Sequence, residues 1–148
     1  MLSFLATLSV NVDPPVDVGV TPEGHRRIIP IVGGTVAGPG FNGRVLPAGA
    51  DFQLLRSAEM TELDARYAVE LEGGEVVYVH NPALRFGAAE DIARLNRGED
   101  VDPALIYFRC TPRFSTAAPG LAWLNHVIAV GTGRRRPGLV EIDVFTVA

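Results

Sequence analysis

The sequence predicts an all-β protein, a single antiparallel β-barrel of about eight strands with one short helix, formed by residues 1–148 as one domain. Two observations lead to this prediction. Apolar and polar residues alternate over many segments of strand length. Glycine (16 residues) and proline (11 residues) separate these segments by short turns, and only one segment has helical character. Closing such a sheet into a barrel would remove its exposed edges.

The first strand is expected at residues 2–12, where apolar residues at even positions alternate with polar ones such as Ser3 and Ser9. This run has no basic start and no small-residue cleavage site before Pro14, so we do not interpret it as a secretion signal. No apolar run reaches the ~20 residues that cross a bilayer. A turn signal then precedes a second strand at residues 26–32.

Repeated glycines in residues 33–49 are expected at the tight bends of a closing sheet. Strands are expected next at residues 50–56 and 62–72, and the latter is the clearest alternating segment in the chain. The Gly73-Gly74 pair predicts a two-residue hairpin that returns into residues 76–80. These last two strands should therefore pair antiparallel.

One helix is expected at residues 88–97. Acidic residues stand in its first turn, arginines stand toward its end, and Gly98 follows it. Ile92 and Leu95 form a modest apolar stripe, which indicates a helix that covers an end or edge of the barrel.

Further strands are expected at residues 106–111, 122–127 and 139–147. In the first of these, Tyr107 and Arg109 share a face with Thr111, because side chains alternate along a strand. The basic cluster at residues 134–136 lies between a glycine and Pro137-Gly138, and we interpret it as a solvated hairpin turn.

Composition excludes several function classes. A net charge of −4 and the absence of a larger basic cluster argue against a nucleic-acid partner. All 13 basic residues are arginine, which excludes a Schiff-base lysine and a phosphate-loop lysine. Cys110 is the only cysteine, so it is interpreted as a buried structural thiol in a cytoplasmic, reducing compartment. The three scattered histidines lack ligand spacing, and neither a metal nor another cofactor is expected.

Several short motifs, in one order, resemble those of the DUF3237 family, also called UPF0311. They are residues 43–53 (GRVLPAGADFQ), 64–67 (DARY), 107–109 (YFR), 123–125 (WLN) and 130–133 (VGTG). The resemblance covers residues 18–147. It implies an antiparallel barrel similar to that of allene oxide cyclase, and it implies no general function.

Four residues are candidates for catalysis. Arg109 either clamps a substrate carboxylate, enolate or phenolate, or pairs with an internal acid, because an unpaired buried charge is unfavourable. Asp51 would carry a proton near neutral pH if it faces a lumen of low dielectric, and it would otherwise be a solvent-facing or turn-capping residue. Tyr67 is either a core residue or a general acid or hydrogen-bond donor, and His80 is a candidate titrating group.

Substrate-binding candidates share polar or aromatic groups on strands that are expected to face the lumen. They are Arg44, Gln53, Tyr107, Trp123 and Asn125. Trp123 and Asn125 would supply a stacking wall and an amide donor, or they would simply pack in the core.

These candidates suggest a cofactor-independent acid/base enzyme, an isomerase, cyclase or lyase, acting on a small cyclic or aromatic organic molecule in the barrel lumen. The alternative is a non-catalytic binding or carrier protein of the lipocalin type. A third interpretation is an interaction module whose aromatic residues form a dimer face. A homodimer is expected from the general frequency of such assemblies.

Overall fold

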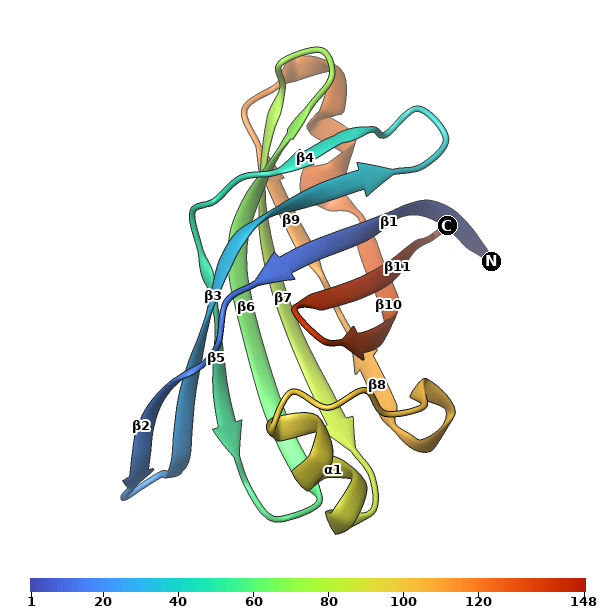
Figure 1. Cartoon of the computed structure of the whole chain (residues 1–148). Helices are drawn as coiled ribbons and strands as arrows, with labels where there is room; N and C mark the ends of the chain where they lie inside the picture. The colour runs from blue at the N-terminus through green and yellow to red at the C-terminus, as the bar shows by residue number, and fades with distance from the viewer.

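A computed structural model describes all 148 residues of the chain (Figure 1). Its 11 strands form one antiparallel sheet, and three short helical segments connect them. The strands are β1 (Leu2–Val12), β2 (Val16–Thr21), β3 (Gly24–Ala37), β4 (Gly43–Val45), β5 (Ala50–Leu55), β6 (Met60–Leu71), β7 (Val76–Phe86), β8 (Tyr107–Cys110), β9 (Arg113–Thr116), β10 (Ile128–Arg136) and β11 (Leu139–Val147). The α-helix is α1 (Ala89–Asn96), and the 3-10 segments are η1 (Pro103–Leu105) and η2 (Pro119–His126). No helix has the length and apolarity that spanning a bilayer would require.

The sheet closes on itself into a barrel. Eight strands pair in the cyclic order β3, β1, β11, β10, β8, β7, β6, β5 and back to β3. Strand β4 lies between β3 and β6, β9 pairs with β7, and β2 pairs antiparallel with the first residues of β3. The predicted fold class, an antiparallel barrel of about eight strands with a short helix, is confirmed.

Strands β6 and β7 form the longest ladder and follow the predicted hairpin through Gly73 and Gly74. Strand β7 runs on to Phe86, beyond the predicted end at residue 80, although it contains Pro82. Proline cannot donate a hydrogen bond to a neighbouring strand. Pro82 lies where one side of β7 changes partner, because β9 pairs with residues 77–80 and β8 pairs with residues 83–86. The strand can therefore continue through the proline.

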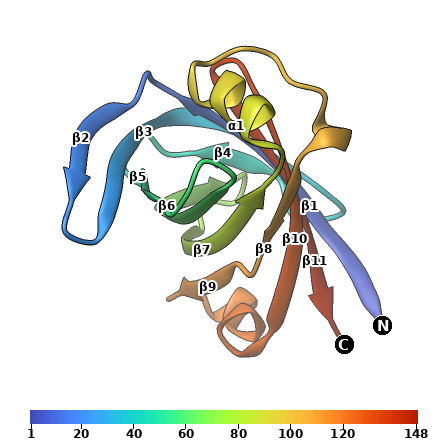
Figure 2. The same ribbon diagram turned by 90° about the horizontal axis from the view of Figure 1, so that it is seen from below.

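The barrel interior has two halves of different chemistry. Near η2 it is apolar, with buried side chains that include Leu8, Val69, Val77 and Leu124. Near α1 it also contains buried polar and charged residues, namely Arg27, Gln53, Thr61, Asn81 and Arg85. Figure 2 shows the barrel from the α1 end, with the helix against one side of the ring.

Helix α1 confirms the helix predicted at residues 88–97 and lies at one end of the barrel, as its apolar stripe indicated. Ile92 and Leu95 are its buried residues. The backbone oxygen of Asn96 accepts a hydrogen bond from Arg27 on β3. The helix therefore packs on the barrel through these two apolar side chains and through the hydrogen bond at Asn96.

The strand expected at residues 122–127 is wrong, because these residues belong to η2. Proline and glycine at positions 119 and 120 start a helical turn, and Leu124 is the one side chain that η2 buries. The Asn125 side chain accepts a hydrogen bond from the backbone nitrogen of Thr116 (2.8 Å) and donates one to its oxygen (3.1 Å). This local pairing replaces the ladder that a strand would need.

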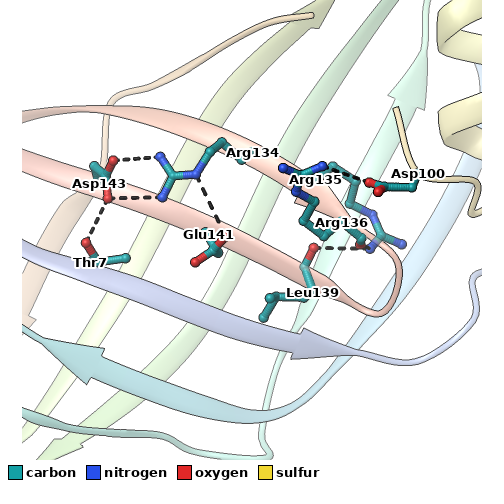
Figure 3. Close-up of polar contacts among 8 residues, drawn as sticks. All are labelled: Thr7, Asp100, Arg134, Arg135, Arg136, Leu139, Glu141 and Asp143. Atoms are coloured by element: carbon teal, nitrogen blue, oxygen red, sulfur yellow. Dashed lines mark hydrogen bonds and ion pairs between the residues drawn. The ribbon is translucent and has the colours of Figure 1, made fainter. Parts of the chain in front are cut away.

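The interpretation of residues 134–136 as a solvated turn is also wrong, because they form the end of β10, and the turn lies at Pro137 and Gly138. Figure 3 shows how partners stabilise the extended form. Arg134 binds Asp143 (2.7 Å), and Arg136 binds Asp100 (2.9 Å). Arg135, between them, points to the lumen.

Candidate functional site

The lumen contains a small cavity of about 40 Å³ in its polar half. A cavity of this size has room for roughly two or three water molecules. Valine, leucine, isoleucine and phenylalanine side chains form much of its wall. Its polar lining comes from four strands and consists of Asp51, Gln53, Tyr67, Asn81, Arg85 and Arg135.

Asp51 is the only carboxyl group in this lining. One of its oxygens accepts a hydrogen bond from Gln53 Nε2 (3.0 Å), and the other accepts one from the backbone nitrogen of Asp64 (3.1 Å). Removal of the carboxyl from water raises the pKa of Asp51, and the Gln53 hydrogen bond and the charge of Arg85 only partly oppose this rise. Asp51 therefore holds its proton to higher pH than an ordinary aspartate.

Three polar atoms that face the lumen have no hydrogen-bond partner within the protein: Tyr67 Oη, Asn81 Oδ1 and Gln53 Oε1. Burial raises the pKa of Tyr67, so its hydroxyl stays protonated and can donate a hydrogen bond. Buried polar groups without partners are rare in proteins. These atoms are therefore available to water or to a ligand in the lumen.

Two buried arginines meet at the end of α1. Arg27 Nη1 donates to the backbone oxygen of Asn96 (3.1 Å), and Arg85 Nη2 donates to Asn96 Oδ1 (3.4 Å). The Arg85 guanidinium also lies 5.8 Å from the centre of the Phe108 ring. Arg85 is only 2% exposed, and desolvation lowers its pKa to about 10. The Nε atoms of both arginines have no partner.

Arg135 is the third guanidinium at this end, and its Nη1 donates to the backbone oxygens of Arg136 and Leu139 (Figure 3). Desolvation lowers the pKa of Arg135 and that of Arg27. No salt bridge in the molecule includes Arg27, Arg85 or Arg135. This end of the lumen therefore carries three positive groups and one carboxyl.

Of the nine residues predicted for the site, the structure brings Asp51, Gln53 and Tyr67 together in the lumen. The expectation that Arg109 lines the lumen is wrong. Arg109 lies on the outer face of β8, where it donates to the Phe108 backbone oxygen (2.9 Å) and stacks on Tyr107 (4.8 Å to the ring centre). The apolar side chains of Phe108 and Cys110 occupy the inner positions, so alternation places Arg109 outside.

Arg109 and Tyr107 line a wide groove of about 840 Å³ on the outside of the barrel. Phe52, Leu84 and Phe145 contribute apolar surface to it. Tyr107, 54% exposed, therefore does not contribute to the lumen.

His80 and Arg44 also lie on the outer face of the barrel. His80 Nε2 lies 2.6 Å from Asp64 Oδ1, and Arg44 forms an ion pair with Glu70 at 3.1 Å. Neither residue lines the lumen cavity.

Trp123 and Asn125 are exposed on η2, outside the barrel ring. The lumen position predicted for them is wrong because the segment is not a strand, and the Asn125 amide is used in binding Thr116.

Sequence reasoning missed Arg27, Arg85, Arg135 and Asn81. The signal for two of them was the alternation of β7, since Asn81 and Arg85 continue the inward face of Val77 and Val79 beyond the predicted strand end at residue 80. Arg135 was missed because residues 134–136 were interpreted as a turn.

The chain was compared with known proteins. Residues 1–147 match the model of DUF3237, a family described as of unknown function. A UPF0311 protein of Rhodopseudomonas palustris is 46% identical over 144 residues, which cover 97% of this chain and 94% of that protein. A UPF0311 protein of Clostridium acetobutylicum is 37% identical over 143 residues, with 96% and 90% coverage.

Solved structures show the same fold. A conserved Rhodopseudomonas palustris protein of unknown function superposes with a TM-score of 0.94 at 45% identity, covering 100% of this chain and 97% of that one. A β-barrel-like protein of Acinetobacter baumannii gives 0.86 at 40% identity, with 99% and 94% coverage. An enzyme of Penicillium herquei gives 0.71 at 20% identity, with 98% and 93% coverage, which is a likeness of fold alone.

Proposed function

The chain belongs to the DUF3237 (UPF0311) family, and we propose that its barrel lumen is the active site of a cofactor-independent acid/base enzyme. The substrate is a small cyclic or aromatic organic molecule. The reaction class is that of an isomerase, cyclase or lyase, in which a proton is moved between atoms of the substrate.

The observation that carries this proposal is the placement of Asp51. Asp51 lines one cavity together with Tyr67 and Arg85, and desolvation raises the pKa of Asp51. Acid/base catalysis is most efficient when the pKa of the catalytic group lies near the working pH. A shifted titratable group that lines a cavity together with hydrogen-bond donors is typical of a catalytic site.

The three groups have distinct roles in the proposed reaction. The Asp51 carboxylate takes a proton from a carbon next to a substrate carbonyl, and the electron pair of the broken C–H bond moves to the carbonyl oxygen. Tyr67 and Arg85 donate hydrogen bonds to this developing oxyanion, each worth about 3 kcal/mol when well placed. Asp51 then returns the proton to another atom of the substrate, so the carboxylate is regenerated.

Deuterium exchange tests this proposal without knowledge of the natural substrate. The protein is incubated in D₂O with a panel of cyclic β-diketones and hydroxyaromatic ketones, and deuterium incorporation is followed by mass spectrometry. We expect accelerated exchange with members of the panel, and a loss of about 10²-fold or more in Asp51→Asn. Asp143→Asn, which removes a carboxyl from the outer face, is the matched control and should exchange as the wild type does.

Equal exchange rates in the wild type and Asp51→Asn would contradict the catalytic role. The alternative, a non-catalytic carrier, is favoured by the apolar half of the lumen, which includes Val69 and Val77. A carrier would bind members of the panel, detected by calorimetry, without any exchange above the rate in buffer.

A further inference from the structure

We propose that the ligand of the lumen carries an anionic oxygen group, a carboxylate or a phenolate, and that in the structure described above Asn96 of α1 occupies the place of this group. This inference rests on the proposed lumen site and names the class of its ligand.

The α1 end of the lumen holds more positive groups than negative ones. Arg27 and Arg85 are nine-tenths or more buried, and Arg135 is partly buried beside them. Asp51 is the one carboxyl in the lining, and it is engaged by Gln53 and the Asp64 backbone without a salt bridge to any arginine. Buried charges are normally paired, because burial of an unpaired charge is unfavourable. An anionic ligand would supply the missing partner.

Asn96 marks where this anion would bind. Two oxygens of this single residue, its backbone oxygen and Oδ1, accept hydrogen bonds from Arg27 (3.1 Å) and Arg85 (3.4 Å). A carboxylate also has two oxygens, and these could accept the same two hydrogen bonds from the guanidinium groups. A carboxylate adds the attraction between opposite charges to these hydrogen bonds, which a neutral amide oxygen does not. An anion can therefore displace Asn96 from the arginines.

A path to this position is open at the surface. A cleft of about 290 Å³ lies beside α1, and Asn96 lines it together with Ala89 and Ala93 of the helix and with His25 and Leu55 of the barrel. Asn96 thus separates this cleft from the arginines of the lumen. A ligand that enters through the cleft meets the arginines once Asn96 moves away.

Helix α1 is suited to such a movement. It has eight residues, its N-cap Ala88 makes no side-chain capping bond, and it buries only Ile92 and Leu95. Helices this short are marginal on their own and depend on tertiary contacts. Displacement of the helix would also enlarge the cavity, which with the helix in place has room for only about two or three water molecules.

The probes for the test are sodium benzoate and its neutral isostere benzamide, with binding measured by calorimetry and by the shift in melting temperature. We expect benzoate to bind at least roughly tenfold more tightly than benzamide. Asn96→Ala should bind benzoate more tightly than the wild type, because no internal oxygen competes. Asn96→Asp should melt at a higher temperature than the wild type without benzoate and bind benzoate roughly tenfold more weakly, because its own carboxylate holds the arginines.

Arg85→Met and Arg109→Met form a matched pair, since both remove a guanidinium, one inside the lumen and one on the outer face of the neighbouring strand. We expect Arg85→Met to lose the preference for benzoate and Arg109→Met to keep it. Circular dichroism checks that each variant folds. If Asn96→Ala does not fold, the benzoate affinity and melting temperature of Asn96→Asp test the role of Asn96.

Equal affinities for benzoate and benzamide, no benzoate binding up to about 10 mM, or an unchanged preference in Arg85→Met would each overturn the inference. Its failure is distinguishable from failure of the proposed function. Deuterium exchange that depends on Asp51 without any preference for anions leaves the enzyme proposal intact and overturns the anion site. A benzoate preference that depends on Arg85, without exchange on any ketone, supports the anion site and contradicts the enzyme proposal.

Discussion

At Asp51 and Arg85 the fold holds ionisable groups where their charged forms are disfavoured. Burial raises the pKa of Asp51 and lowers that of Arg85 to about 10. Such placements reduce stability, and groups with perturbed pKa values cluster at functional sites. On the outer face the charged form of Asp143 is favoured instead, since a hydrogen bond of 2.7 Å from Arg134 lowers the pKa of Asp143.

The two aspartates should therefore respond to pH with opposite sign. The raised pKa of Asp51 gives a stabilising contribution that is present below the ordinary value of 3.8 and is lost as pH rises through the raised pKa. The free energy of unfolding of the wild type minus that of Asp51→Asn should thus decrease from about pH 4 toward neutrality. The same difference for Asp143→Asn should increase with pH up to the ordinary value, because the pKa of Asp143 is lowered.

Urea unfolding of the three proteins at a series of pH values measures these differences. A difference for Asp51→Asn that stays flat across the series would show that the Asp51 carboxyl is not desolvated in the folded protein.

Replacement of Arg85 by methionine should stabilise the protein by about 1 kcal/mol, because a desolvated guanidinium is exchanged for an apolar chain of similar length beside Phe108. Arg109→Met, at the exposed outer position, should change the free energy of unfolding by less than about 0.5 kcal/mol. Thermal unfolding followed by circular dichroism gives both values. Destabilisation of Arg85→Met by several kcal/mol would indicate that Arg85 is paired in the folded protein.

At the scale of elements, β8 and β10 approach one another through the glycines of β10. A Cβ atom on Gly133 would lie 2.7 Å from the ring of Phe108, and one on Gly131 would lie 2.6 Å from Cys110 Sγ. Both distances are shorter than any van der Waals contact, so the two β8 side chains fill the space that the glycines leave. The glycines thereby position Phe108, over which the Arg85 guanidinium lies.

Gly133→Ala should therefore destabilise the barrel by about 1–3 kcal/mol, because the Phe108 ring has to move within a packed interior. Gly120→Ala is the matched control, since a Cβ there meets no atom within 4 Å, and it should lie within about 0.5 kcal/mol of the wild type. Urea midpoints at constant slope give the comparison. Equal midpoints for the two variants would mean that β8 shifts without loss of packing.

At the scale of the whole molecule, the ring of strands is not equally strong around its circumference. The first and last strands, β1 and β11, pair over nine positions, and β10 pairs with β11 over nine. The pairing between β8 and β10 includes only two, Cys110 with Gly131 and Arg109 with Thr132. This seam lies directly beside the candidate site, because Phe108 of β8 lines the lumen.

We expect the barrel to open first at this seam. Backbone amides of β8 should exchange with solvent at least about tenfold faster than those in the centres of β1 and β11, because few hydrogen bonds must break to expose them. Hydrogen exchange read by nuclear magnetic resonance resolves the individual amides. Equal protection of β8 and β11 would show that the ring opens only by global unfolding.

The local pattern of the chain was enough to predict most of the elements. Alternation identified β1, β5, β6 and β11, paired glycines predicted the hairpin between β6 and β7, and charge placement predicted α1. These predictions succeeded because each depends on residues that are close in sequence. The length of β7 was not predictable in this way, because the tolerance of Pro82 depends on the gap between β8 and β9, and both of these strands are far from Pro82 in sequence.

The sequence by itself determined which residues share a face of a strand, and so it grouped Asp51 with Gln53 and Tyr107 with Arg109. Only the tertiary structure decided which face is the inside. Alternation along a strand separates its two faces but does not say which of them is buried. In this barrel both faces carry apolar residues, with Phe52 and Leu84 exposed outside and Val77 and Val79 buried within. The direction in which the sheet curls therefore placed Asp51 with Arg85 in the lumen and left Arg109 on the surface.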